Sequence, residues 1–100
     1  MYCDTIPAKN LSQYINKPGC LIVDLRDYSE YAKGHIPSAV NIPIERIEKQ
    51  SQQFIGYKEI VLYCSRGSHS LMCARSLKTN CCCYSVYGGI CAYRGTLVKD

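Results

Sequence analysis

The chain has 100 residues, of which 47% are hydrophobic and 20% are charged, with a formal net charge of +4 at pH 7. This length and composition indicate one ordinary globular domain, spanning residues 1–100, with a modest single core. The charge is mild and no run of Lys and Arg accompanies it, which argues against nucleic-acid binding and suits a small anionic substrate better.

The first half of the chain alternates apolar runs typical of strands with segments at helical spacing. The run that begins at Cys20 is continuously apolar, as in a strand buried on both faces. Leu11, Tyr14 and Ile15 repeat with the period of a helix, and Gly34 is a typical helix stop. These patterns predict strands at residues 2–6, 20–25 and 39–42 and helices at residues 7–15 and 27–33.

The second half continues the alternation. Ile44, Ile47 and Phe54 share one face of a helix, although the polar Ser51 interrupts it. A turn at residues 88–89 comes near the end of the chain. The patterns predict strands at residues 59–63 and 82–86 and helices at residues 44–54, 70–80 and 90–93. Strands that alternate with helices imply a mostly parallel sheet covered on both faces.

Cys64 follows the apolar strand at residues 59–63 and precedes a short polar loop and a predicted helix. Parallel α/β sheets bind their ligands at the carboxyl ends of the strands. The amino end of a helix offers unpaired N–H groups and a partial positive charge, both of which favour an anion. We therefore expect a stabilised thiolate at Cys64.

Eight cysteines are many for this length and raise two alternatives. Disulfide scaffolds are usually secreted and poor in regular elements, unlike this pattern. Zinc is disfavoured because there is no Cys-x-x-Cys pair and the contiguous cysteines 81–83 would alternate between the faces of a strand. We expect that most of the cysteines are reduced, that several are core residues, and that there is no metal site. With no leader and no apolar run near the ~20 residues of a membrane span, we expect a cytoplasmic protein without membrane contact.

Four segments, at residues 21–26, 34–43, 60–70 and 88–93, together resemble in their order the rhodanese-like sulfurtransferase family, over about residues 5–97. They are the signature strand, a Gly-His-Ile-Pro segment in which Ser38 replaces the usual second Gly, the cysteine loop, and a closing Gly-Gly segment with Tyr93 in the aromatic place. Each segment alone would be weak evidence, but the four together are specific.

The resemblance implies a three-layer α/β/α domain with a central, mostly parallel five-stranded sheet. In such an enzyme Cys64 carries a sulfane sulfur as a persulfide. The sulfur comes from a small anionic donor (thiosulfate or a persulfide) and passes to a thiol or cyanide acceptor, with no cofactor, and the donor or acceptor can also be a protein. The implied active-site loop consists of Ser65, Arg66, Gly67, Ser68, His69 and Ser70, and the implied structural support consists of Asp24, Arg26 and His35.

Within this loop, Arg66 and His69 are candidates to hold an anionic donor, and Gly67 allows the backbone to curl around the sulfur. Some thiosulfate-using members look to have Arg in the place of His69. Because His is only partly charged near pH 7, we expect persulfide transfer more than thiosulfate turnover. Asp24 and Arg26 are interpreted as an ion pair and His35 as a brace for its loop.

Three alternatives stay open on the sequence alone. The domain can be a partner-dependent sulfur-relay or binding module with little small-molecule turnover. A cysteine phosphatase or arsenate reductase is less expected, because a phosphatase loop is longer and ends in an Arg that grips the phosphate, and neither His69 nor Ser70 can replace that Arg. A second cysteine can also resolve a Cys64 persulfide into a disulfide, and the candidates are Cys73, Cys81, Cys82, Cys83 and Cys91.

Overall fold

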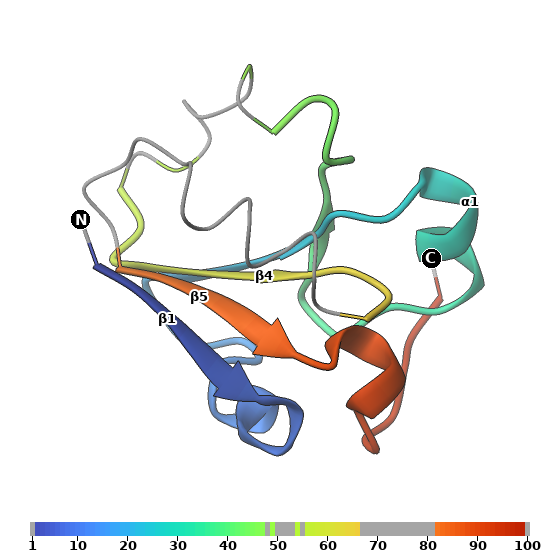
Figure 1. Ribbon diagram of the computed structural model, residues 1–100, viewed down its shortest axis with the longest axis horizontal. Helices are drawn as coiled ribbons and strands as arrows, with labels where there is room; N and C mark the ends of the chain where they lie inside the picture. The colour runs from blue at the N-terminus through green and yellow to red at the C-terminus, as the bar shows by residue number, and fades with distance from the viewer. Residues whose placement is uncertain (1, 48, 50–53, 55, 67–81, 100) are drawn as a thin grey trace.

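A sheet of five parallel strands organises the protein in the computed structural model, which describes residues 2–47, 49, 54, 56–66 and 82–99. The strands lie in the order β1-β5-β4-β2-β3 (Figure 1). They comprise β1 (Tyr2–Pro7), β2 (Cys20–Asp24), β3 (Val40–Asn41), β4 (Glu59–Tyr63) and β5 (Cys82–Tyr87). The expected parallel α/β sheet is confirmed, with the first strand at one edge and β4 in the centre.

Both faces of the sheet are buried, because successive side chains of a strand point to opposite sides. On one face, here called the Cys64 face, the buried cluster comprises Leu21, Val23, Leu25, Ile42, Ile47, Phe54, Ile60, Leu62, Cys64 and Cys83. On the other, the Tyr63 face, it comprises Ile6, Ala8, Leu11, Ile22, Ile36, Ala39, Val61, Tyr63 and Val86. This double burial explains why β2 and β4 read as almost continuous apolar runs.

Three short helical segments accompany the sheet in the described residues: α1 (Tyr28–Lys33) and the 3-10 helices η1 (Ala8–Gln13) and η3 (Gly89–Ala92). The predictions place all three correctly, but the first and last are 3-10 rather than α. In η1 the buried residues are Ala8 and Leu11. Their separation of three matches the repeat of a 3-10 helix, so Ala8 and Leu11 lie on the same side of η1 and both pack on the Tyr63 face of the sheet.

The helix predicted at residues 44–54 is wrong for its first part. Residues 44–47 form turns, with the Arg46 N–H donating to the Pro43 carbonyl and the Ile44 N–H donating to the Leu25 carbonyl. The predicted apolar face nevertheless packs inward, since Ile47 and Phe54 are buried on the Cys64 face. Residues 48, 50–53 and 55 lie outside the described residues, as does the predicted helix at 70–80.

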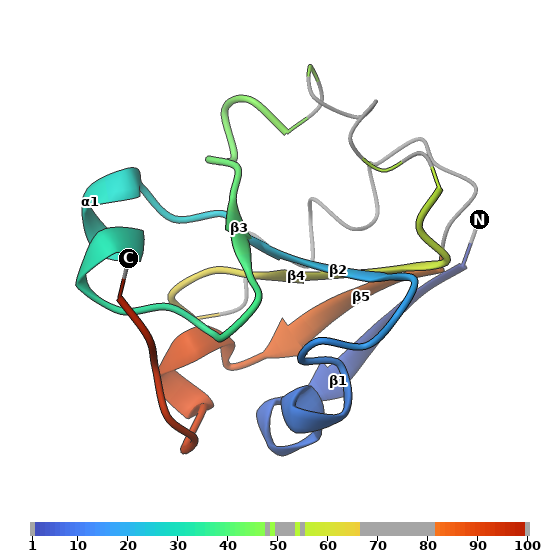
Figure 2. The ribbon, with the colours of Figure 1, turned by 180° about the vertical axis from the view of Figure 1, so that it is seen from behind.

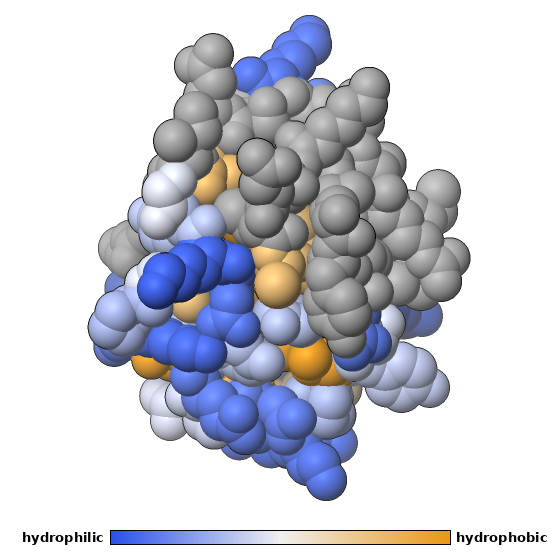
Figure 3. All heavy atoms as spheres, turned by 90° about the vertical axis from the view of Figure 1, so that its left-hand side faces the viewer, coloured by the Kyte–Doolittle hydropathy of each residue, from blue (hydrophilic) through white to orange (hydrophobic). Residues whose placement is uncertain are grey.

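The side of the molecule where the strands begin differs from the side where they end. On the side where the strands begin, the described surface is mostly hydrophilic with small apolar patches between (Figure 3). On the side where they end, β3 and α1 lie close to the end of β4, as the reverse view shows (Figure 2). None of the described helices is long and apolar enough to cross a membrane.

Leu11 is fully buried at the base of η1, so we predict that Leu11→Ala lowers the free energy of unfolding by about 2–5 kcal/mol. The exposed neighbour Ser12 is the matched control, and Ser12→Ala should change stability by no more than about 0.5 kcal/mol. Urea denaturation of both variants measures the difference. Equal effects would show that η1 does not anchor the Tyr63 face.

Candidate active site

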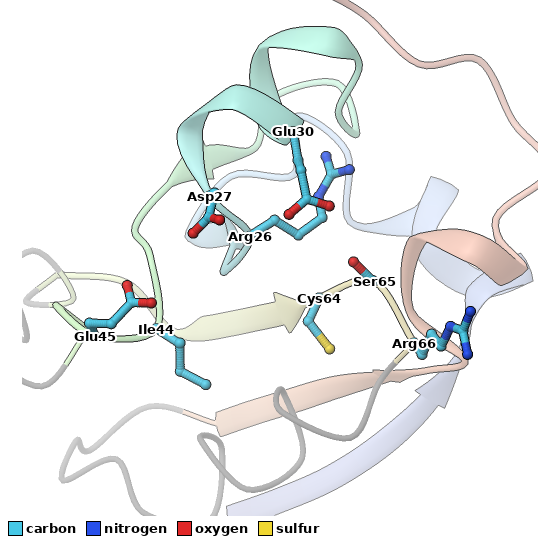
Figure 4. A pocket seen from close by; sticks show the side chains of 8 residues that line it. All are labelled: Arg26, Asp27, Glu30, Ile44, Glu45, Cys64, Ser65 and Arg66. Carbon is cyan, nitrogen blue, oxygen red and sulfur yellow. The ribbon is translucent and has the colours of Figure 1, made fainter.

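Cys64 lies directly after β4, at the carboxyl end of the central strand, as the sequence pattern predicts. Only 6% of its surface is exposed. The exposed part opens into a pocket of about 350 Å³. Figure 4 shows the sulfur between Ile44 on one side and Arg66 on the other, with the α1 residues above it. The lining residues are Arg26, Asp27, Glu30, Ile44, Glu45, Cys64, Ser65 and Arg66.

The predicted cysteine loop is described only at its start. Ser65 and Arg66 line the same pocket as the thiol, and Arg66 is exposed. Its guanidinium group points away from the Cys64 sulfur (Figure 4). The other predicted loop residues, Gly67, Ser68, His69 and Ser70, lie outside the described residues.

The Gly-Gly segment supports the backbone beneath the thiol. The Ile90 N–H donates to the Cys64 carbonyl at 2.9 Å, and the Cys91 N–H donates to the Ser65 carbonyl at 3.1 Å. Gly89 has a φ of +62°, and a Cβ added there would lie 2.4 Å from the Cys64 carbonyl oxygen. Only glycine allows this approach, so the start of η3 fixes the position of Cys64.

A buried carboxylate organises the strand ends on the Tyr63 face of the sheet, opposite Cys64. Asp24 is fully buried and accepts hydrogen bonds from Arg26 Nη2 and from the Tyr63 hydroxyl, both at 2.7 Å. Arg26 Nε and the Arg26 backbone N–H also donate to Asp24. This geometry satisfies the buried charge with charge-assisted hydrogen bonds.

The same network shifts the protonation of its members in a consistent direction. Burial and the Asp24 charge raise the pKa of Tyr63 far above its ordinary value, so its hydroxyl stays protonated and donates. Burial alone would lower the pKa of Arg26, but its hydrogen bonds to Asp24 outweigh this effect and the pKa is raised. Arg26 is therefore held as a cation beside the carboxylate.

These side chains also hold the two loops that flank the site. Arg26 Nη2 donates to the Gly34 carbonyl at 2.7 Å, and the Tyr63 hydroxyl accepts from the Ile36 N–H at 3.2 Å. The Asn41 side chain donates to the carbonyls of Asp24 and Arg26. The segment after α1 and the end of β3 are thus tied to the ends of β2 and β4.

His35 lies away from the pocket, inside its own loop. It is 2% exposed, its ring stacks on Tyr31 with centroids 3.8 Å apart, and Nδ1 lies 2.9 Å from the Tyr31 carbonyl oxygen. Its backbone exchanges two hydrogen bonds with Val98. His35 therefore joins the end of α1 to the C-terminal segment.

Four pocket-lining residues were not predicted as site residues from the sequence: Asp27, Glu30, Ile44 and Glu45. A signal for two of them was present, since Asp27 and Glu30 are three residues apart at the start of α1 and share one side of the helix. Ile44 and Glu45 follow β3, and the carboxyl ends of parallel strands meet at one edge of a sheet.

The other described cysteines differ sharply in access. Cys20, Cys64, Cys82, Cys83 and Cys91 carry thiols rather than disulfides. Cys83 is fully buried, which leaves no path for thiol exchange, whereas Cys91 is exposed. Burial and the nearby Glu59 raise the pKa of Cys20 to about 11. Cys73 and Cys81 lie outside the described residues.

In the described part of the chain, His, Cys, Asp and Glu residues form no group of three or more that could hold a metal ion.

Comparison with known proteins identifies the fold and its family. The family model described as "Rhodanese-like domain" matches residues 7–96. The chain therefore belongs to the rhodanese-like family.

A rhodanese-like domain protein from Staphylococcus aureus of known structure is 27% identical, with a TM-score of 0.82 over 97% of this chain and 98% of that one. The Bacillus subtilis "putative sulfur carrier protein YrkF" is 40% identical over 57% of this chain and 31% of its own length. A "tRNA sulfurtransferase" from Desulfurococcus amylolyticus is 34% identical over 79% of this chain and 16% of its own length. The chain thus spans a third or less of these two curated relatives.

We predict that Gly89→Ala destabilises the protein by at least about 2 kcal/mol more than Gly56→Ala. Both glycines have positive φ, but nothing lies within 4 Å of a Cβ at Gly56, so that variant measures backbone strain alone. At Gly89 the added methyl also overpacks against the Cys64 carbonyl. Denaturant unfolding of the two variants gives the difference. Equal losses would mean that η3 can move away from Cys64 without cost.

We predict that Asp24→Asn lowers the free energy of unfolding by about 3 kcal/mol, because it leaves the mostly buried Arg26 without its counter-charge. The control is Glu59→Gln in the more exposed Lys17–Glu59 ion pair, which should cost much less. Thermal or urea unfolding at pH 7 measures both. A small effect at Asp24 would contradict the structural importance of the buried pair.

Proposed function

We propose that this rhodanese-like domain is a sulfurtransferase that carries a sulfane sulfur on Cys64. The observation that carries the proposal is the Cys64 thiol at the carboxyl end of the central strand, opening into a pocket of about 350 Å³. Family membership supports the reaction class. The donor is thiosulfate or a persulfide, and the acceptor is a thiol or cyanide.

The proposed reaction consists of two nucleophilic displacements. The Cys64 thiolate attacks the outer sulfur of the donor, the donor S–S bond breaks, and its electron pair leaves with sulfite or with a thiolate. The product is a Cys64 persulfide. The acceptor then attacks the outer sulfur, the new S–S bond breaks, and the Cys64 thiolate is restored. Neither step needs an external oxidant or reductant. In each step a neutral sulfur atom with six valence electrons is transferred, and the electron pair of the broken S–S bond stays with the leaving group.

The surroundings of Cys64 suit a reactive intermediate. The thiol is almost fully buried, and a persulfide formed there would be sheltered from solvent and from stray thiols. The fixed backbone beneath it, held by Ile90 and Cys91, limits motion of the nucleophile. The proposal assigns thiolate stabilisation to the loop N–H groups and to the helix predicted at residues 70–80. Arg66 and His69 are, as the sequence predicts, the candidates to hold an anionic donor.

A second candidate is a sulfur-relay module that works with a protein partner. The similarity to a putative sulfur carrier and to a tRNA sulfurtransferase, each much longer than this chain, favours it. A second pocket of about 500 Å³ shares Asp27 and Glu45 with the Cys64 pocket, which extends the surface that a partner would meet. Either candidate belongs to a cytoplasmic protein, as expected from the sequence.

A phosphatase or arsenate reductase is opposed by the charges of the pocket. Three carboxylates, those of Asp27, Glu30 and Glu45, line it in the described residues. They disfavour a phosphate or arsenate dianion, and for the same reason they disfavour the thiosulfate dianion relative to a persulfide donor.

We predict that Cys64→Ser abolishes sulfur loading without unfolding the domain. The intact mass of the unreduced protein is measured after incubation with thiosulfate, separately with a low-molecular-weight persulfide, and then after addition of cyanide. The native protein should gain one sulfur atom and lose it to cyanide, with release of thiocyanate.

The matched control is Cys91→Ser, which removes an exposed thiol close to the same backbone and should still load. Loading that persists in Cys64→Ser would contradict the assignment of the carrier. Loading by a partner protein but by neither small donor would favour the relay module.

A further inference from the structure

The mouth of the Cys64 pocket is acidic, although the whole chain carries a net charge of +4. Asp27 and Glu30 come from the start of α1, and Glu45 follows β3. All three are exposed, and none forms an ion pair within the described residues. Figure 4 shows the Asp27 and Glu30 carboxylates on the α1 side of the pocket and Glu45 beside Ile44.

The two cations of the pocket do not balance these carboxylates. The Arg26 guanidinium is bound to Asp24 and to the Gly34 carbonyl, and its side chain is only 10% exposed. The Arg66 guanidinium points away from the Cys64 sulfur (Figure 4). A ligand that enters from the mouth therefore meets an excess of negative charge among the described residues. Clefts lined by one sign of charge concentrate ligands of the opposite sign.

We propose that the preferred sulfur donor is a small persulfide whose carrier bears an ammonium group, and that Glu30 and Glu45 select for it against thiosulfate and other donors with added negative charge. This inference rests on the proposed function and names the substrate class of that site. The ammonium group lies toward the carboxylates, while the sulfane sulfur faces Cys64. Ile44 offers an apolar contact to the short carbon chain between them.

The sulfur transfer from this donor is the same nucleophilic displacement as the first step of the proposed reaction. The Cys64 thiolate bonds to the outer sulfur of the aminoalkyl hydropersulfide, and the donor S–S bond breaks. The electron pair leaves with the aminothiolate, which takes a proton from water. A pocket of about 350 Å³ lies within the range of small-ligand sites, so a donor of this size fits inside it.

The test measures the rate at which Cys64 is loaded by three hydropersulfides of matched size. They derive from 2-aminoethanethiol (cationic), 2-mercaptoethanol (neutral) and 3-mercaptopropionate (anionic). Each rate, read by quenched intact mass at pH 7, is divided by the rate of the same donor with a free small thiol, so that intrinsic reactivity cancels. We expect the cationic donor to exceed the anionic donor by roughly tenfold at low salt, with a smaller gap at 1 M salt, where the screening length is about 3 Å.

Charge-removing variants test whether the pocket carboxylates cause the preference for the cationic donor. Glu30→Gln combined with Glu45→Gln should bring the cation-to-anion ratio close to one. Asp4→Asn removes the same charge type from an exposed position in β1, at the far edge of the sheet from β3, and should leave the ratio unchanged. Equal normalised rates in the native protein, or a faster anionic donor, would overturn the inference while the carrier role stands. Loading by thiosulfate but by none of the three would overturn the inference alone, whereas loading by none of the three and not by thiosulfate would overturn the proposed function itself.

Discussion

The architecture of the site depends on one buried charge, the carboxylate of Asp24. A buried carboxylate is costly unless it is paired and hydrogen-bonded. Arg26 and Tyr63 meet both needs, and Tyr63 is the register partner of Asp24 across β2 and β4. A shift of one residue in this pairing would turn the tyrosine to the other face and leave the carboxylate without its hydroxyl donor. The charge thus fixes the register of the two central strands at the end where the site lies.

Because residues alternate along a strand, this register also determines where the thiol points. Tyr63 faces the Asp24 network, so Cys64 faces the opposite side, where it joins the Leu62 cluster and opens into the pocket. The close approach of Gly89 to the Cys64 carbonyl then holds the thiol from a third strand, β5, through the turn that follows it. Two constraints that lie away from the pocket therefore place the Cys64 thiol.

How far the sequence predicts this arrangement depends on whether a feature is local. The strands around Val23 and Leu62 were predictable because burial on both faces leaves a continuous apolar run. The 3-10 geometry of η1 was not, because Leu11 and Tyr14 fit a repeat of three as well as a repeat of 3.6. The turns at residues 44–47 replace a helix, because the Arg46 N–H bonds to Pro43 and the Lys49 N–H to Arg46, and the apolar spacing does not distinguish these three-residue turns from a helix. The acidic mouth was missed because Glu30 and Glu45 are distant in sequence and line the same pocket only when the sheet has formed.

The contrast between the net charge of the chain and the local charge of the pocket affects how substrates should be inferred. The overall charge of +4 favoured an anionic substrate, but charges more than about 10 Å from a ligand are largely screened in physiological salt. The groups that line the pocket therefore govern recognition, and Asp24 has already neutralised the nearer guanidinium, that of Arg26. The same ion pair that orders the strand ends thus removes a cation from the mouth. In this way a structural interaction on the Tyr63 face sets the electrostatic character of the pocket on the Cys64 face.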